Sequence, residues 1–133
     1  MKVTIEVPES HMLNMLCNAM YSNEYLEIVD GEGGKVTEWV KKTPNAMEGY
    51  DHAECWEPRL FAYLKSNKDH AFKFLDTYSD DEVQLTWENM CSGMMKMSTN
   101  QVQHMSDLLT GRDDSITADV WLQCSLFDDV IYC

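Results

Sequence analysis

Basic residues are scarce in this chain. It has 10 Lys and Arg against 23 Asp and Glu among 133 residues, a formal net charge of −13 at pH 7. Nucleic-acid affinity depends on cationic side chains that neutralise phosphates. The charge balance therefore excludes a general phosphate-binding surface and predicts no direct nucleic-acid partner. It favours a partner protein with a basic surface, because a strong negative field speeds and selects such encounters.

Long apolar runs are also missing. No stretch approaches the roughly 20 residues of a membrane-spanning helix, and the opening MKVTIEVPES lacks the apolar segment of a signal peptide. The five cysteines are odd in number and widely spaced, whereas a disulfide framework favours an even count in loops. We therefore expect a cytoplasmic protein with reduced thiols and no membrane partner.

Catalytic motifs are absent from the sequence. It contains no glycine-bounded nucleophile elbow, no P-loop, no GxGxxG and no HExxH. The glycine-rich stretch Gly31–Gly34 is short, acidic and not followed by a helical pattern, so it fails as a phosphate-binding loop. We expect a protein that is not an enzyme and has no cofactor.

One pair of residues has the spacing of zinc ligands. His52 and Cys55 lie in DHAEC, within the aperiodic stretch from Lys41 to Glu57. Structural zinc generally takes four ligands in two pairs, and the sequence offers no second pair. We expect ordinary loop residues and no metal site. A small metal-dependent protein or enzyme that uses this loop is the alternative.

Length and patterning predict a single α+β domain. The 133 residues, 44% of them hydrophobic, suit one domain with one core. Alternating apolar and polar residues predict strands over Lys2–Val7, Tyr25–Val29, Lys35–Val40, His70–Leu75 and Val83–Leu85. The DTYSDD between the last two predicts a β-hairpin. The stretch RLFAYL, residues 59–64, fits either a short strand or one helical turn.

Apolar residues at helical spacing predict about four helices that pack on one face of a small, mostly antiparallel sheet. The expected starts are Pro8, Glu9 or Ser10 for the first helix, with Thr86, then Ser98 or Thr99, then Asp114 or Ser115 as the caps of the others. The first helix is expected to fray near residues 21–23, and Gly111 is expected just past the end of the third.

The last of these helices, within Arg112–Cys133, is too apolar for a single exposed stripe. Its apolar residues include Trp121 and Phe127. A helix that is apolar on all sides is largely buried. It is therefore expected to be the central helix of the core.

Methionine is abundant in the two preceding helices. Five methionines crowd there: Met90, Met94, Met95, Met97 and Met105. They fit either a core or an adaptable apolar groove that takes a partner. Cys91 and Cys124 lie in apolar stripes, where a buried cysteine acts as a small hydrophobic residue.

The acidic residues occur in groups that are candidates for a partner-binding surface. These candidates are Glu24, Glu27, Asp30, Glu32, Asp76, Asp80, Asp81, Glu82, Asp113 and Asp114. Such groups either solvate the surface or face a partner, and unbalanced charge destabilises the compact state by self-repulsion.

The two ends of the chain, KVTIEVPESHMLNMLCNAM and TADVWLQCSLFDDVIYC, resemble a family of small proteins encoded by bacteriophages and prophages. Those proteins begin with a strand and a Pro-Glu-started helix, and end on a Thr-Ala-Asp segment followed by an aromatic residue, Leu and Gln. The chain departs from that pattern at Asp128 and Cys133, where glycine is usual.

The resemblance implies a phage protein that acts in a bacterial host. Together with the charge, it predicts an acidic protein that inhibits or modulates a host complex, as an anti-CRISPR protein or another anti-defence protein does, by occupying a basic nucleic-acid-binding surface. The alternative is a structural or replication-linked phage protein that forms a homo-oligomer through the Met-rich helices.

Overall fold

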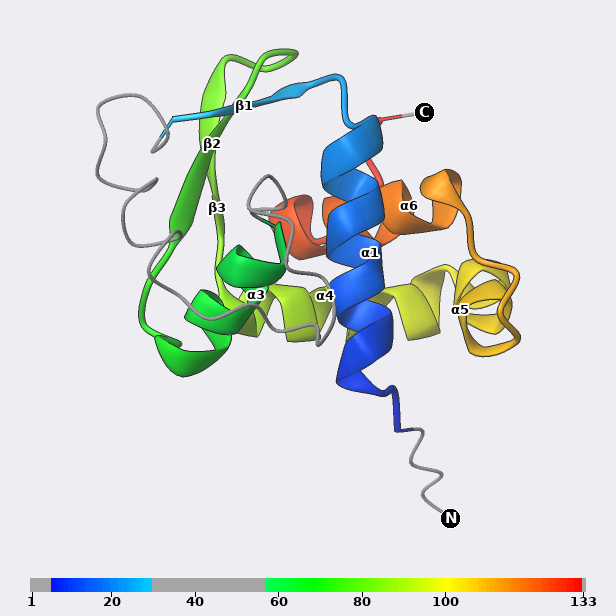
Figure 1. The fold of residues 1–133 in the computed structure, drawn as a ribbon. Helices are drawn as coiled ribbons and strands as arrows, with labels where there is room; N and C mark the ends of the chain where they lie inside the picture. The colour runs from blue at the N-terminus through cyan, green and yellow to red at the C-terminus, as the bar shows by residue number, and fades with distance from the viewer. Residues whose placement is uncertain (1–5, 30–56, 133) are drawn as a thin grey trace.

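The computed structural model describes residues 6–29 and 57–132, and these residues form a small α+β fold (Figure 1). The elements in chain order are α1 (Glu9–Ser22), β1 (Leu26–Ile28), α3 (Glu57–Ser66), β2 (Phe72–Asp76), β3 (Asp81–Leu85), α4 (Trp87–Asn100), α5 (Val102–Leu109) and α6 (Ser115–Phe127). The predicted fold class is confirmed. The described residues contain five helices, where about four were expected.

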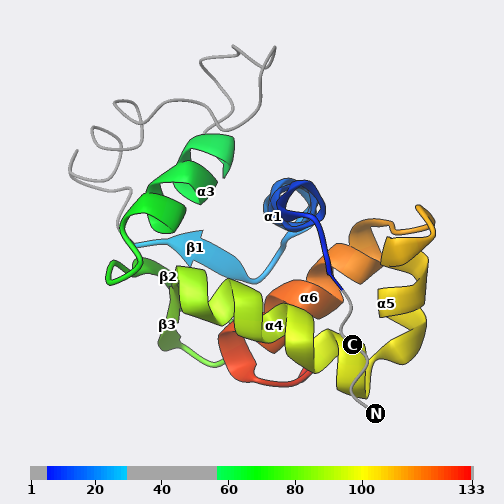
Figure 2. The same cartoon turned by 90° about the horizontal axis from the view of Figure 1, so that it is seen from below.

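The sheet is antiparallel, with β2 between β1 and β3. Phe72, Phe74 and Asp76 of β2 are buried on one face, as the period of two in a strand requires. Figure 2 shows the sheet at one side of the molecule, with α1, α4 and α6 beside it. The predicted hairpin is confirmed, with Phe74 paired to Val83.

Helix α6 is the central helix, as predicted. It packs against α1, α4, α5 and β3. Trp121 and Leu122 are completely buried, and Phe127 at the last turn is partly buried. The apolar character of this helix on all sides therefore reflects neighbours on all sides.

The close approach of α4 to α6 depends on Gly93. A Cβ atom at this position would lie 2.0 Å from Ser125 Oγ and 2.9 Å from Ser125 Cα. Beside this contact, Trp121 Nε1 donates a hydrogen bond of 3.2 Å to the backbone oxygen of Met90. Gly93, which weakens α4 as a helix, thus allows the two helices to pack.

Four helix ends agree with the sequence. Helix α1 ends at Ser22. Thr86 and Asp114 cap α4 and α6, since each side chain accepts a hydrogen bond from a backbone N–H three residues later. Gly111 has φ 75° and ends α5 with the two hydrogen bonds of a Schellman motif, Gly111 N to Leu108 O and Arg112 N to Asp107 O.

The predicted start of α5 is wrong. Ser98 and Thr99 lie inside α4, where their hydroxyl groups donate to the backbone oxygen of Met95. Helix α4 ends before Gln101, whose φ of −131° and ψ of 57° are not helical, and α5 begins at the next residue. A serine or threonine that bonds back to the preceding turn satisfies its hydroxyl without ending the helix.

The stretch 59–64 is helical and belongs to α3, which buries Leu60, Phe61 and Leu64 at helical spacing. The strand predicted over Lys2–Val7 is not present at Glu6 and Val7, and its other residues lie outside the described ones. The strand predicted over residues 35–40 and residues 41–56 of the predicted loop also lie outside them, whereas Glu57, the last residue of that loop, begins α3. No helix in the described ranges is both long and apolar enough to cross a membrane.

The Gly93 contact predicts that Gly93→Ala destabilises the protein. Alanine raises helix propensity by about 1 kcal/mol, but the added methyl group collides with backbone of α6, and overpacking typically costs about 1–3 kcal/mol. Because the methyl group would meet the Cα of Ser125 at 2.9 Å, the overpacking cost is expected at the upper end of that range. The free energy of unfolding in urea is therefore expected to fall by about 2 kcal/mol, the difference between these two effects. The neighbouring Ser92→Ala, which changes propensity alone, is expected to leave stability equal or slightly higher. A Gly93→Ala protein as stable as the wild type contradicts the contact.

Candidate functional site

The side chain of Gln123 joins α6 to the carboxy-terminal tail. It is completely buried. Its Nε2 donates to Asp119 Oδ2 at 2.8 Å and to the backbone oxygen of Tyr132 at 3.1 Å, and its Oε1 accepts from the backbone N–H groups of Ile131 and Tyr132 at 2.9 and 2.8 Å. An amide has two donor hydrogens and two acceptor lone pairs. All four are used, so the tail is held in one position.

The fixed tail places the ring of Tyr132 in a cluster of aromatic side chains. The centroid of its ring lies 5.1 Å from those of Tyr25 and Tyr78 and 5.6 Å from that of Phe127. Tyr25 and Tyr78 are 5.7 Å apart. Rings tilted or edge-on at these distances attract one another. The cluster therefore joins three segments that are far apart in the sequence.

Asp76 lies beneath this cluster and is not a surface residue, which corrects its place in the predicted acidic surface. It is fully buried. Its carboxylate accepts hydrogen bonds from Tyr132 Oη, Ser79 Oγ and Tyr78 N. Burial by itself raises the pKa of Asp76, but these hydrogen bonds outweigh it and the net pKa is lowered. The carboxylate therefore stays charged and orders the hairpin turn.

Tyr25 connects β1 to α6. Its hydroxyl donates to Asp119 Oδ1 at 2.9 Å. Burial and the adjacent Asp119 raise the pKa of Tyr25 far above its ordinary value, so the hydroxyl remains a donor at any physiological pH. The turn before β1 is fixed by Asn23, whose Oδ1 accepts from the backbone N–H groups of Tyr25 and Leu26.

A hollow of about 360 Å³ opens beside the tyrosine cluster. Its lining is Ser22, Asn23, Glu24, Tyr25, Tyr78, Ser115, Ile116, Asp119 and Tyr132. Figure 1 shows the end of α1, the start of β1, the β2–β3 turn and the carboxy terminus at this same end of the molecule. We call this region, with the exposed turn residues Asp80 and Asp81, the acidic-tyrosine face.

The structure brings only some of the predicted acidic residues to this face. Glu24 lines the hollow, and Asp80 and Asp81 are exposed on the adjacent turn. Asp113 and the capping Asp114 directly precede Ser115 at its edge. Acidic residues from three segments therefore converge at one end of the molecule.

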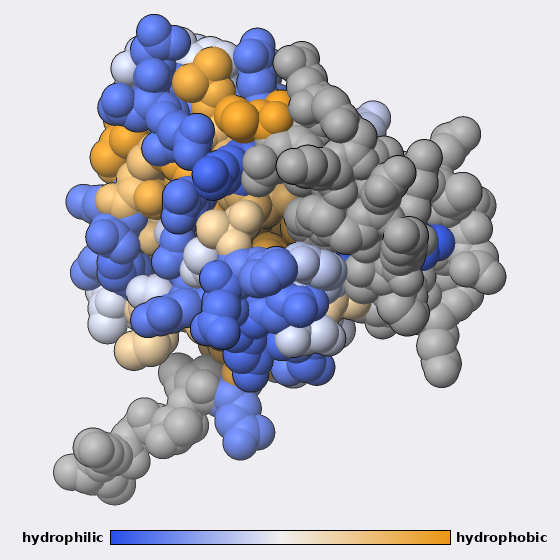
Figure 3. Space-filling view, turned by 90° about the vertical axis from the view of Figure 1, so that its left-hand side faces the viewer, coloured by the Kyte–Doolittle hydropathy of each residue, from blue (hydrophilic) through white to orange (hydrophobic). Residues whose placement is uncertain are grey.

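Glu27 and Glu82 lie elsewhere, on the outer face of the sheet, where both pair with Leu75. Glu82 also forms an ion pair of 3.8 Å with Lys73. Figure 3 shows hydrophilic and hydrophobic residues interleaved on this side of the molecule. Asp30 and Glu32 lie outside the described residues.

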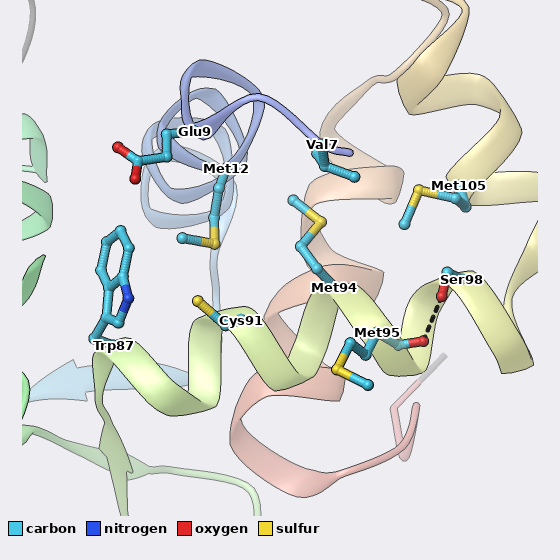
Figure 4. A pocket seen from close by; sticks show the side chains of 9 residues that line it. All are labelled: Val7, Glu9, Met12, Trp87, Cys91, Met94, Met95, Ser98 and Met105. Atoms are coloured by element: carbon cyan, nitrogen blue, oxygen red, sulfur yellow. Dashed lines mark hydrogen bonds between the residues drawn. The ribbon is translucent and has the colours of Figure 1, made fainter. Parts of the chain in front are cut away.

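A second, larger cavity of about 560 Å³ lies between α1, α4 and α5 (Figure 4). Its lining is Val7, Glu9, Met12, Trp87, Cys91, Met94, Met95, Ser98 and Met105. The core reading of the methionines is confirmed for most of them, and the reading as a groove that takes a partner stays a prediction. Four of the five, Met90, Met94, Met97 and Met105, are buried in the core, and two of these four also line the cavity with Met95, which is 71% exposed.

Cys91 is exposed at this cavity, which corrects the expectation that it is buried, whereas Cys124 is buried as predicted. Partial burial of the thiol raises the pKa of Cys91, so its reactive thiolate form is disfavoured. Within residues 6–29 and 57–132, no three His, Cys, Asp or Glu side chains are grouped to hold a metal ion. His52 and Cys55 lie outside these ranges.

The residues that build the acidic-tyrosine face are mostly ones that the sequence did not single out. Gln123 is a fully buried amide in an apolar helix, and a polar residue inside an apolar run is a signal that it has internal partners. Asp119 precedes it by one helical turn, the spacing at which side chains meet. Nothing local in the sequence connects either of them to Tyr25 or Tyr78.

Comparisons with protein-family models, with curated proteins and with solved structures find no match to this chain. Its function is therefore inferred from the geometry and charge of the face itself.

Replacement of Gln123 tests whether it holds the tail. Gln123→Met keeps a side chain of similar length but removes four hydrogen bonds, each worth about 0.5–1.5 kcal/mol net. The free energy of unfolding is expected to fall by about 3 kcal/mol. Gln103→Met, at an exposed glutamine of α5, is expected to change it by less than about 0.5 kcal/mol. Equal effects of the two substitutions contradict the role of Gln123.

The lowered pKa of Asp76 means that its contribution to the free energy of unfolding depends on pH. Its pKa is lowered in the folded protein, so its stabilisation is present above the pKa of an unfolded aspartate, about 3.9, and is lost as the pH falls through the folded value. Asp76→Asn is therefore expected to reduce the free energy of unfolding at pH 7, and the difference from the wild type is expected to shrink below about pH 4. Tyr132→Phe, which removes one of the hydrogen bonds, is expected to behave in the same way. A difference that does not change between pH 7 and pH 2.5 rules this out.

Proposed function

We propose that the protein is a phage-encoded, non-enzymatic binding protein that acts in the cytoplasm of a bacterial host. In this proposal, it attaches through the acidic-tyrosine face to a basic surface of a host complex and inhibits or modulates that complex. The occupied surface is one that otherwise holds nucleic-acid phosphates, as expected for an anti-CRISPR protein or another anti-defence protein.

The observation that carries the proposal is an acidic, aromatic face whose carboxylates at Glu24, Asp81 and Asp119 form no ion pair with another described residue. The ion pairs among the described residues engage Glu9, Glu82 and Asp128 instead. With a net charge of −13, the whole molecule attracts basic surfaces. The face adds exposed tyrosine, a residue type that is enriched at protein interfaces.

Carboxylates and phosphates bind the same cationic side chains, because both offer charged oxygen atoms to Arg and Lys. A protein that places several carboxylates at one end can therefore compete with nucleic acid for such a surface. The tyrosine rings supply contact area with little conformational entropy to lose.

The test uses two matched triple variants. Glu24→Gln/Asp80→Asn/Asp81→Asn removes charge from the face, and Glu6→Gln/Asp69→Asn/Glu88→Gln removes it from exposed positions outside the hollow. Each triple neutralises three of the acidic residues behind the charge of −13, so both carry −10. Only the position of the charge distinguishes them.

The immobilised proteins are incubated with bacterial lysate and washed at graded salt. The wild type and the second triple are expected to retain a protein that salt or double-stranded DNA elutes, while the first triple retains at least about tenfold less, since like-charge and ion-pair effects at interfaces reach several kcal/mol. Retention that is insensitive to salt, or equal for both triples, would falsify the proposal.

A further inference from the structure

The hollow beside the tyrosine cluster has the chemistry of a cation subsite. Asp119 lines it, and the two oxygens of its carboxylate are each held by one hydrogen bond, from Tyr25 Oη at 2.9 Å and from Gln123 Nε2 at 2.8 Å. A carboxylate can accept about four hydrogen bonds. Each oxygen of Asp119 therefore keeps acceptor capacity while its position is fixed.

No Lys, Arg or His among the described residues forms an ion pair with this carboxylate. Glu24 at the rim adds a second carboxylate to the same hollow. A partly buried negative charge without a partner is stabilised by a cation brought from outside.

Three of the nine residues that line the hollow are tyrosines. Tyr25, Tyr78 and Tyr132 line it, and Tyr78 is 62% exposed. The face of an aromatic ring carries negative charge density that attracts a cation within about 6 Å of the centroid. A planar cation gains further, because it stacks on the ring while its N–H groups reach a carboxylate at its edge.

We infer that the hollow binds the guanidinium group of one arginine side chain of the partner. Guanidinium is planar and presents paired N–H donors suited to the two oxygens of one carboxylate, whereas an ammonium group is a compact, strongly hydrated point charge. The inference rests on the proposed function and adds that arginine is selected over lysine at this point of the face.

The test is an NMR titration with N-acetyl-arginine methylamide and with N-acetyl-lysine methylamide at constant ionic strength. The arginine compound is expected to shift the backbone amide signals of Glu24, Ile116 and Asp119 and to bind at least about fivefold tighter than the lysine compound. Tyr78→Leu is expected to weaken arginine binding about three- to fivefold, the size of an exposed cation–π contact. Tyr21→Leu, at a 93% exposed tyrosine outside the hollow, is expected to leave it unchanged.

Asp119→Asn keeps the size of the side chain and an oxygen that can accept from Tyr25. It is expected to abolish the preference for arginine, with a thermal melt as the folding control. Equal binding of both compounds, or arginine binding that survives both Asp119→Asn and Tyr78→Leu, overturns the inference. Those results leave the proposed function standing, because it requires only positive charge. Conversely, the hollow can prove selective for arginine while the two triple variants retain lysate protein equally. That combination refutes the proposed function and supports the arginine subsite.

Discussion

The buried amide of Gln123 is the interaction on which the acidic-tyrosine face depends. Its four hydrogen bonds fix the tail at Ile131 and Tyr132 on one side and the carboxylate of Asp119 on the other. A buried amide that lost its partners would carry an unsatisfied polar group at a cost of about 1–3 kcal/mol. The same side chain therefore stabilises the fold and positions the groups that face solvent, so the site cannot be separated from the core.

Helix α6, which carries Gln123, packs against most of the other elements. Gly93 lets it approach α4 closely, and its other neighbours α1, α5 and β3 surround it. A helix packed on all sides has little freedom to shift. Asp119, on this helix, is thus held by a rigid element, and groups held in position before binding lose less entropy when a partner arrives.

The Met-lined cavity between α1, α4 and α5 is a different kind of surface, apolar and rich in sulfur.

Local patterns predicted the elements whose signals are local. The hairpin, helix α1, the Thr86 and Asp114 caps and the buried α6 all follow from spacing or capping within a few residues. The stretch 59–64 stayed ambiguous because short apolar runs fit strand and helix alike. Ser98 and Thr99 were predicted as caps because a Ser or Thr hydroxyl group can hydrogen-bond to the backbone both at the start of a helix and inside it.

The site was less predictable, because its contacts join residues far apart in the chain. Asp76 belongs to an acidic group in the sequence, yet Tyr132, 56 residues later, covers it and bonds to it. Asp119 and Gln123 belong to the terminal helix, whose apolar pattern predicts only a place in the core. Asp119 meets Tyr25, which directly precedes β1, and Gln123 meets the tail that returns to α6. No local pattern encodes either contact.

Native-state amide hydrogen exchange tests most directly whether the tail and α6 form one unit. The amides of Ile131 and Tyr132 both donate to Gln123 Oε1. They are predicted to exchange with the same opening free energy as Leu122 inside α6, because their exposure requires the Gln123 contacts to break. Exchange of these two amides at the rate of an unstructured chain, with α6 still protected, contradicts the account.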